Sequence, residues 1–176
     1  MTDLEKANTY QEEKRVDESG KPVYHVTPPV GWMNDPNGFS IFEGMIHLFY
    51  QYHPYSDVWG PMHWGHYISK DFVKWKELPA ALAPDTDYDA AGCFSGSAIE
   101  TEEGHALLYT GVMEKEKRDG SKEVIQQQCL ALGDGLHYKK ISGNPVILSE
   151  QLPEGFSRED FRDPKVWREE ETYYLV

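Results

Sequence analysis

Two short runs of the sequence place an aspartate where it could serve as a catalyst. Asp35 lies within residues 31–38, which read GWMNDPNG, and Asp163 lies in the run Arg-Asp-Pro that ends at Pro164. Asn, Asp, Pro and Gly also cluster in turns for ordinary conformational reasons, so a turn explains each motif taken alone. The chemistry therefore depends on whether the chain brings the two carboxylates together.

Two carboxylates that converge on an aromatic pocket suit glycosidic chemistry. One carboxylate can attack or stabilise a cationic sugar centre, while flat aromatic faces hold the ring. The aromatic residues that could line such a pocket are Trp32, Trp59, Trp64 and Phe94. Arg162 could keep a neighbouring carboxylate ionised or bind a hydroxyl. In the alternative interpretation, Asp163 orders the turn before Pro164, and Arg162 pairs with a surface acid such as Glu159.

The elements that must position these residues are predicted to be short antiparallel strands. After residue 22, apolar and aromatic runs alternate with Gly, Pro, Asn and Asp, and helical periodicity is nearly absent. A strand, a short turn such as Glu43-Gly44 and a second strand are expected in each of five stretches, namely residues 39–52, 63–78, 94–112, 124–141 and 162–176. A polar cluster precedes the first strand of each unit, with Gly38, Gly96 and Pro164 in similar places.

Four-stranded units that recur at intervals of roughly 60 residues are typical of a β-propeller, with a β-sandwich as the competing fold. The inner strands of a propeller start around one channel, where Asp35 and Asp163 would face each other. The sequence holds two units and half of a third, and it ends at Val176 inside an apolar strand. We expect an all-β fragment of a longer protein, with a polar N-terminal tail (1–22) and the incomplete N-terminal part of a propeller domain (23–176).

Composition limits the class of partner. The chain has 17 Lys and Arg against 30 Asp and Glu, a net charge of −13, which opposes binding to nucleic acid or to anionic membranes. Aromatic residues make up 13% of the chain, which favours a β fold or a site that stacks flat apolar faces. We therefore expect a small neutral ligand, with no nucleic acid and no membrane as partner.

No metal, cofactor or export signal is predicted. His63 and His66 are three residues apart on a predicted strand, so they point to opposite faces and would not chelate together. Two cysteines are too few for a disulfide scaffold, and the first 22 residues lack the apolar segment of a signal peptide. We expect a cytoplasmic protein.

Five motifs carry a family resemblance. WMNDPNG, FYQYHP, WGHYIS, FSGSA and FRDPKV, in this order, closely resemble glycoside hydrolase family 32, the β-fructosidases, which include invertases, sucrose-6-phosphate hydrolases, levanases and inulinases. The match runs from about Tyr24 to Val176. The resemblance implies a five-bladed β-propeller followed by a β-sandwich, of which this chain would cover about two and a half blades and none of the sandwich.

The same resemblance implies residue roles. Asp35 resembles the nucleophile that attacks the anomeric carbon of the fructosyl unit and forms a covalent intermediate. Asp163 resembles the transition-state stabiliser, which hydrogen-bonds the fructose hydroxyls. Residues similar to the substrate-binding positions of the family are Asn34, Gln51, Trp59, Phe94, Ser95 and Arg162.

One departure from the family concerns the general acid. The family's acid is a Glu in a Glu-Cys motif that would lie beyond Val176, and without it the reaction loses a factor of about 10² to 10⁴. We therefore expect a parent β-fructofuranosidase for sucrose, sucrose 6-phosphate or fructo-oligosaccharides, and an inactive 176-residue chain. The alternatives are a fructosyltransferase, in which a sugar replaces water, and a carbohydrate-binding propeller fragment without catalysis.

Overall fold

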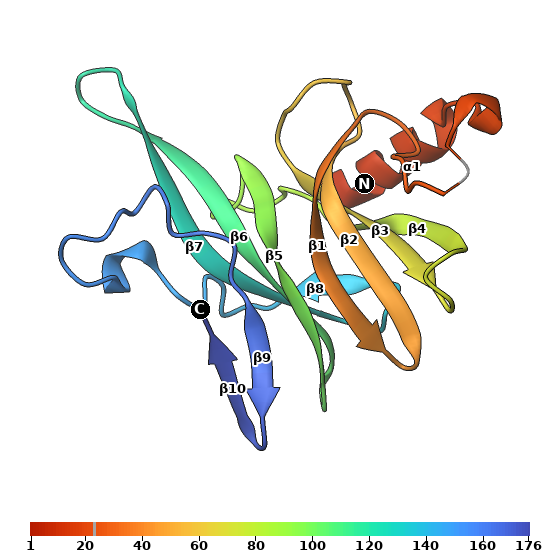
Figure 1. Cartoon of the computed structure of the whole chain (residues 1–176). Coiled ribbons are helices and arrows are strands. Elements are labelled where there is room, and N and C mark those ends of the chain that lie inside the picture. The colour runs from red at the N-terminus through yellow and green to blue at the C-terminus, as the bar shows by residue number, and fades with distance from the viewer. Residues whose placement is uncertain (23) are drawn as a thin grey trace.

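The fold is built from antiparallel hairpins (Figure 1). The computed structural model describes residues 1–22 and 24–176, and the all-β class is confirmed, with a single α-helix, α1 (Asp3–Lys14), in the described part of the chain. Two short 3-10 turns are η1 (Glu18–Gly20) and η2 (Ser149–Gln151). The strands are β1 (Trp32–Phe42), β2 (Met45–His53), β3 (His63–Ser69), β4 (Trp75–Leu82), β5 (Gly92–Thr101), β6 (Gly104–Glu116), β7 (Lys122–Gly133), β8 (Tyr138–Lys140), β9 (Val166–Glu169) and β10 (Thr172–Leu175).

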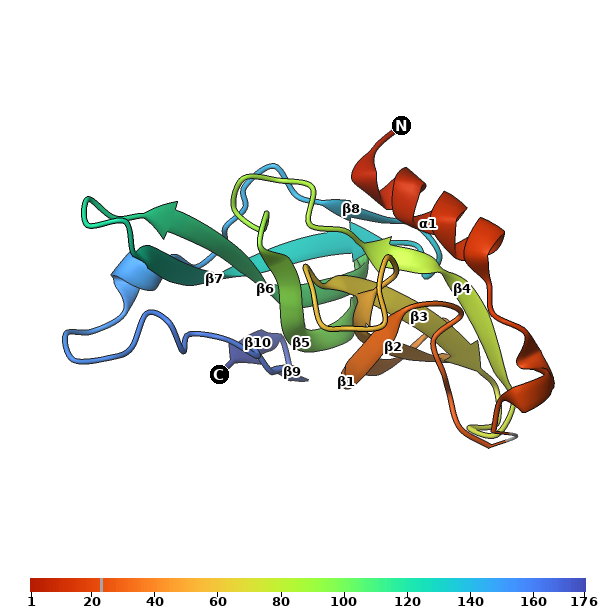
Figure 2. The same ribbon diagram turned by 90° about the horizontal axis from the view of Figure 1, so that it is seen from above.

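The strands form two meanders and a hairpin. β1–β4 make the first sheet, β5–β8 make the second sheet, and β9 pairs with β10. All five predicted strand pairs are present, and the turn at Glu43-Gly44 is confirmed, since both residues have positive φ, 49° and 74°. Figure 2 shows the two sheets side by side and the β9–β10 hairpin next to β5. Each meander has the form of a propeller blade.

The first strands of the two sheets start earlier than the sequence predicted. β1 begins at Trp32 and β5 begins at Gly92, so the expected polar clusters before the first strands are wrong for these two units. The Asn, Asp and Gly residues remain within the strands because the pairing ladders shift there. In the third unit the cluster precedes β9, as expected, since β9 begins only at Val166.

The core lies where the first two sheets meet. Phe49 and Trp64 from the first sheet pack with Leu107 and Tyr109 from the second, and all four are fully buried. A Cβ at Gly38, which has φ +52°, would lie 2.6 Å from the Phe49 ring, so only glycine lets β1 approach this core.

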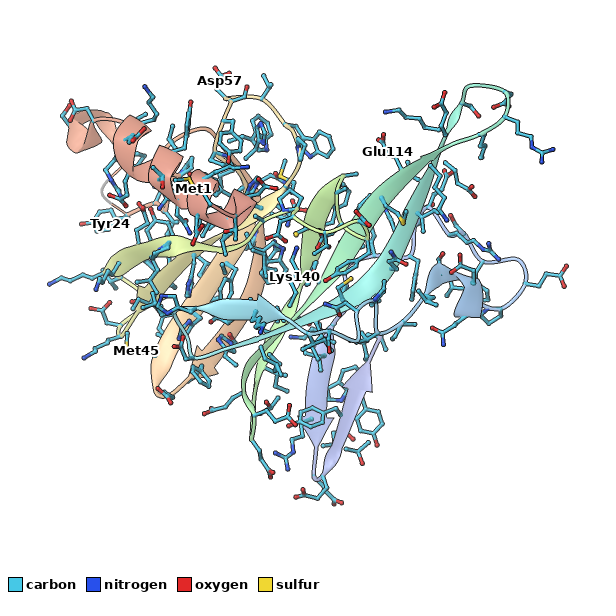
Figure 3. All side chains as sticks on the ribbon, turned by 180° about the vertical axis from the view of Figure 1, so that it is seen from behind. Met1, Tyr24, Met45, Asp57, Glu114 and Lys140 are labelled. Atoms are coloured by element: carbon cyan, nitrogen blue, oxygen red, sulfur yellow. The ribbon has the colours of Figure 1, made fainter. Side chains whose placement is uncertain are left out.

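A buried ion pair also joins the two sheets. Lys140, on β8, is labelled near the centre of the molecule in Figure 3, and its Nζ lies 2.5 Å from Oδ2 of Asp89. The Asp89 side chain is fully buried, and the Tyr109 hydroxyl donates to it at 2.9 Å. A buried charge is tolerated only with such partners. The loop between β4 and β5 is therefore tied to β8.

Helix α1 lies in the segment for which the sequence predicted only a polar tail. Thr2 and Glu5 form a capping box at its start. Asn8 fixes the helix to β4, because its side chain accepts from Ala80 N at 2.7 Å and donates to Ala80 O at 3.4 Å. No helix in the described ranges is both long and apolar enough to span a membrane. The domain boundary expected at Val23 falls outside the described residues.

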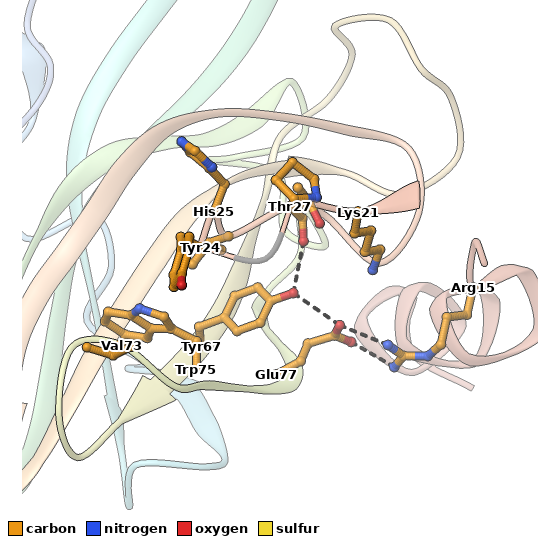
Figure 4. A pocket seen from close by; sticks show the side chains of 11 residues that line it. Arg15, Lys21, Tyr24, His25, Thr27, Tyr67, Val73, Trp75 and Glu77 are labelled. Carbon is orange, nitrogen blue, oxygen red and sulfur yellow. Dashed lines mark hydrogen bonds and ion pairs between the residues drawn. The ribbon is translucent and has the colours of Figure 1, made fainter. Parts of the chain in front are cut away.

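A cavity of about 420 Å³ lies between the N-terminal segment and the outer strands of the first sheet (Figure 4). Arg15 donates two hydrogen bonds to Glu77, of 2.9 and 2.8 Å, and the Tyr67 hydroxyl donates to Thr27 O at 2.9 Å. These bonds hold the N-terminal segment against β3 and β4. The cavity is separate from the residues that the sequence singled out.

Candidate active site

Asp35 lies at an irregularity in β1. The ladder between β1 and β2 pairs Met33 and then resumes at Pro36, so that Asn34 and Asp35 together stand opposite the single residue Gln51. Two residues against one define a β-bulge, which bends the strand and redirects its side chains. The Asp35 side chain is exposed there. The bulge thus turns a strand residue into one that faces outward.

Ser95 lies at a second irregularity, in β5. The pairing of β5 with β6 shifts between Phe94 and Gly96, which leaves Ser95 as the extra residue. Its hydroxyl donates a hydrogen bond of 3.2 Å to Oδ2 of Asp35. Two bulges, one in each sheet, therefore meet at the Asp35 carboxylate.

Asp163 approaches from the loop before β9. Its backbone lies in the left-handed region, with φ 63°, and its N–H donates to Oγ1 of Thr110 at 3.0 Å. Partial burial raises the pKa of the Asp163 carboxyl, the positive charge of Arg162 lowers it, and the negative charge of Asp35 raises it, with a net upward shift. The negative charge of Asp35 thus acts on the carboxyl of Asp163.

Arg162 lies beside this pair of acids. Its Nε is 3.9 Å from Oδ2 of Asp163, and its Nη1 is 3.2 Å from Oδ1 of Asp160. A surface acid is indeed its partner, but it is Asp160 and not Glu159, the example named from the sequence. The guanidinium, whose side chain is 45% exposed, keeps donors free for a ligand.

The remaining sequence-predicted residues lie at different depths in the structure. Asn34 Oδ1 accepts a hydrogen bond of 2.7 Å from the Trp32 indole. Gln51 is buried, and its Nε2 donates to Cys93 O at 3.0 Å. Trp59, in the loop between β2 and β3, is 57% exposed and meets the Phe94 ring edge-on at 6.0 Å.

The prediction that Trp64 lines the pocket is wrong. Trp64 is fully buried in the core, so its ring cannot line a pocket. Its indole N–H donates to Phe94 O at 3.2 Å, which fixes the strand that carries Ser95. The side chains of Asp35 and Asp163 are both exposed.

Two residues behind the acids were missed by the sequence analysis. Thr110 on β6 and Gln128 on β7 are a cross-strand pair, and both are buried. The signal that could have found Gln128 is the run Gln126-Gln127-Gln128, three polar residues inside a strand, all of them buried. Thr110 carries no such signal. Among the described residues, no three His, Cys, Asp or Glu side chains gather as metal ligands.

Comparisons with known proteins identify the family. Residues 25–176 match the Glycosyl hydrolases family 32 N-terminal domain. The sucrose-6-phosphate hydrolase of Zymomonas mobilis is 47% identical over 158 residues, covering 88% of this chain and 29% of that enzyme. The raffinose invertase of Escherichia coli is 44% identical over 156 residues, covering 88% of this chain and 31% of that enzyme. The chain thus spans less than a third of the length of these relatives.

Solved structures give the same result. A variant of a β-fructofuranosidase from Bombyx mori, in complex with sucrose, superposes with a TM-score of 0.86 and 41% identity, covering 98% of this chain and 36% of that one. The sucrose-6-phosphate hydrolase of Lactobacillus gasseri superposes with a TM-score of 0.76 and 34% identity, covering 98% and 33%. Because the family match extends over nearly the whole chain and relatives are almost half identical to it, the chain belongs to glycoside hydrolase family 32.

Proposed function

We propose that the protein is a retaining β-fructofuranosidase that cleaves terminal β-D-fructofuranosyl bonds, with a five-bladed propeller as its catalytic domain. The observation that carries this proposal is that hydrogen bonds connect Asp35, Ser95 and Asp163, the last of them through Thr110, although the three residues come from three separate units. A retaining glycosidase requires a carboxylate nucleophile and a separate acid, and Asp35 fits the first of these roles. Family membership supports the assignment to fructosyl bonds.

In the proposed mechanism, Asp35 is the nucleophile. One carboxylate oxygen attacks the anomeric carbon of the fructosyl unit and forms an ester as the bond to the leaving oxygen breaks. Ser95 holds Oδ2 of Asp35, which leaves Oδ1 free for the attack. Water then cleaves the ester, so the product keeps the configuration of the substrate. A proton for the leaving oxygen comes from a third acid.

Asp163 stabilises the transition state in this proposal. Its carboxylate accepts hydrogen bonds from fructose hydroxyls, and these bonds strengthen as the ring becomes cationic. Ionised Asp163 is required for this role, and the guanidinium of Arg162 favours that form.

The bound fructosyl ring is held by the other predicted residues. Trp59 and Phe94 offer aromatic faces at the open side of the site, which suits a sugar with one apolar face. Polar contacts come from Asn34, Gln51 and Arg162. The relatives that are sucrose-6-phosphate hydrolases favour sucrose or its 6-phosphate as the substrate.

The 176 residues alone are proposed to be inactive. The third acid of the mechanism is assigned to none of the acids in this sequence. Glu169 ends β9, Glu170 and Glu171 form the turn before β10, and all three are exposed. Unassisted departure of the leaving oxygen costs a factor of about 10² to 10⁴. We expect fructose release from the full encoded protein and none from residues 1–176.

Product analysis tests the proposal directly. We expect the full encoded protein to release fructose from sucrose, with the β-anomer first by NMR. Asp35→Asn should lower the rate by about 10⁴-fold or more, and the control Asp119→Asn, in the exposed turn between β6 and β7, should not change it. Inverted product, or a rate of Asp35→Asn within tenfold of the wild type, would refute the mechanism. Sugar-extended products would indicate fructosyl transfer.

A further inference from the structure

A buried hydroxyl links the backbones of Ser95 and Asp163. Thr110 is fully buried on β6, and its Oγ1 accepts the N–H of Asp163 at 3.0 Å. The same Oγ1 lies 3.2 Å from the carbonyl oxygen of Ser95 and 3.3 Å from Oε1 of Gln128. A hydroxyl has one proton, so Thr110 donates to one of these two acceptors at a time. It thereby touches the backbones of both residues that flank the site.

Gln128 extends this connection to the third unit. It stands opposite Thr110 in the β6–β7 ladder, and its Nε2 donates to Phe161 O at 2.8 Å. The loop that carries Asp163 is therefore bound at two places to side chains of the second sheet. The Thr110 and Gln128 side chains that make these bonds are buried, where an unmade hydrogen bond is costly.

The conformation of Asp163 makes this support necessary. Its φ of 63° lies in the left-handed region, which a residue other than glycine occupies stably only when its surroundings fix it. The bond from Asp163 N to Thr110 is such a constraint. Loss of the hydroxyl would leave a backbone N–H without its partner and free the residue to relax.

We propose that Thr110, supported by Gln128, is the positioning residue that sets the carboxylate of Asp163 relative to Ser95 and Asp35. The expected effect on kcat rests on the proposed function. The expected effect on the position of the Asp163 carboxylate rests on the hydrogen bonds alone. The hydroxyl, and not the volume of the side chain, carries the effect. Serine at position 110 should therefore preserve activity, whereas valine, which has nearly the same shape as threonine, should not.

Kinetics of the full encoded protein tests the proposal. With sucrose as substrate, Thr110→Val should lower kcat by about 10- to 100-fold with a smaller change in KM, and Thr110→Ser should restore it to within about threefold. The control is Thr101→Val, which removes a hydroxyl that donates to Gly104 O and accepts from Glu103 N at the far end of β5. If valine and serine are equally active, or if kcat of Thr110→Val stays within threefold of the wild type, the proposal is refuted.

A second measurement separates this proposal from the proposed function. The carboxyl of Asp163 is titrated by NMR in wild type, Thr110→Val and Thr110→Ser, which requires no turnover. We expect its pKa to move in the valine variant only; an unchanged titration refutes the proposal even if sucrose is hydrolysed. If Thr110→Val does not fold, Gln128→Met removes the bond to Phe161 O while keeping the Thr110 hydroxyl, and the same titration decides. If the wild-type protein does not hydrolyse sucrose, the proposed function is refuted, while the titration still tests the positioning role of Thr110.

Discussion

The hydroxyl of Ser95 donates a 3.2 Å hydrogen bond to Oδ2 of Asp35, across the junction of two sheets. Each residue lies at a place where its strand departs from regular pairing. A regular strand alternates its side chains between two faces, so neither residue could reach the other without these shifts. The contact therefore depends on two local irregularities, one in each sheet, that lie next to each other.

Ser95→Ala is expected to weaken catalysis without changing the fold. A hydrogen bond to a charged group contributes about 1.5 to 3 kcal/mol, so kcat/KM should fall about 10- to 100-fold. Initial rates of sucrose hydrolysis by the full encoded protein measure the loss. Ser142→Ala, in the exposed loop after β8, is the matched control and should match the wild type. Equal rates for both variants would argue against a role for the Ser95 hydroxyl.

The pKa of Asp163 should respond in opposite directions to its two charged neighbours. Arg162 lowers this pKa and Asp35 raises it, so Arg162→Gln should raise it further and Asp35→Asn should reduce it. Activity that needs ionised Asp163 is lost as the pH falls through its pKa. The acid limb of the rate profile should therefore move to higher pH in Arg162→Gln. Carboxyl NMR titration and pH profiles check this; shifts of the same sign in both variants would contradict it.

Three histidines buried between the sheets should make the fold sensitive to acid. His47 Nδ1 and His66 Nε2 are 2.9 Å apart, and His105 bonds Ser40 Oγ at 2.9 Å and Tyr138 OH at 2.8 Å. Burial lowers the pKa of all three, and that of His105 to about 3 from 6.5. Unfolded histidines take up protons near pH 6.5 while these do not, so stability is present above that pH and is lost below it.

Urea unfolding between pH 7 and pH 5 measures this loss. The free energy of unfolding should fall by up to about 1.4 kcal/mol per pH unit for each buried histidine. His105→Gln should make the dependence shallower, and His137→Gln, whose side chain is 79% exposed, should leave it unchanged. A wild-type stability that is flat over this range would contradict the expectation.

Two adjacent lysines should differ sharply in their contribution to stability. Lys140→Met would leave the fully buried Asp89 without its ion-pair partner, at a cost of about 3 to 5 kcal/mol. Lys139→Met changes an exposed side chain on the same strand and should cost less than about 0.5 kcal/mol. Thermal or urea denaturation compares the two. Equal midpoints would mean that Asp89 is compensated by its other partners.

The strand pairs could be predicted from the sequence, whereas the local geometry of the site could not. The alternation of apolar runs with turns such as Glu43-Gly44 is a local signal, and the hairpins that it predicted are present. The bulges at Asp35 and Ser95 depend on how two strands pair, which no single run of residues records. Trp64 failed as a pocket residue because its neighbours in the motif do not determine which strand face meets the core. The propeller's blade number and the roles of the acids stay predictions.

The convergence of three units at one carboxylate pair has a consequence for stability. Asp35 belongs to the first sheet, Ser95 to the second, and Asp163 to the segment that leads into the third unit. A sugar bound to all of them would add contacts to the packing and hydrogen bonds that already join these parts of the chain. An inhibitor that binds only when these parts are packed together stabilises only that folded state. A saturating inhibitor should therefore raise the free energy of unfolding of the whole domain.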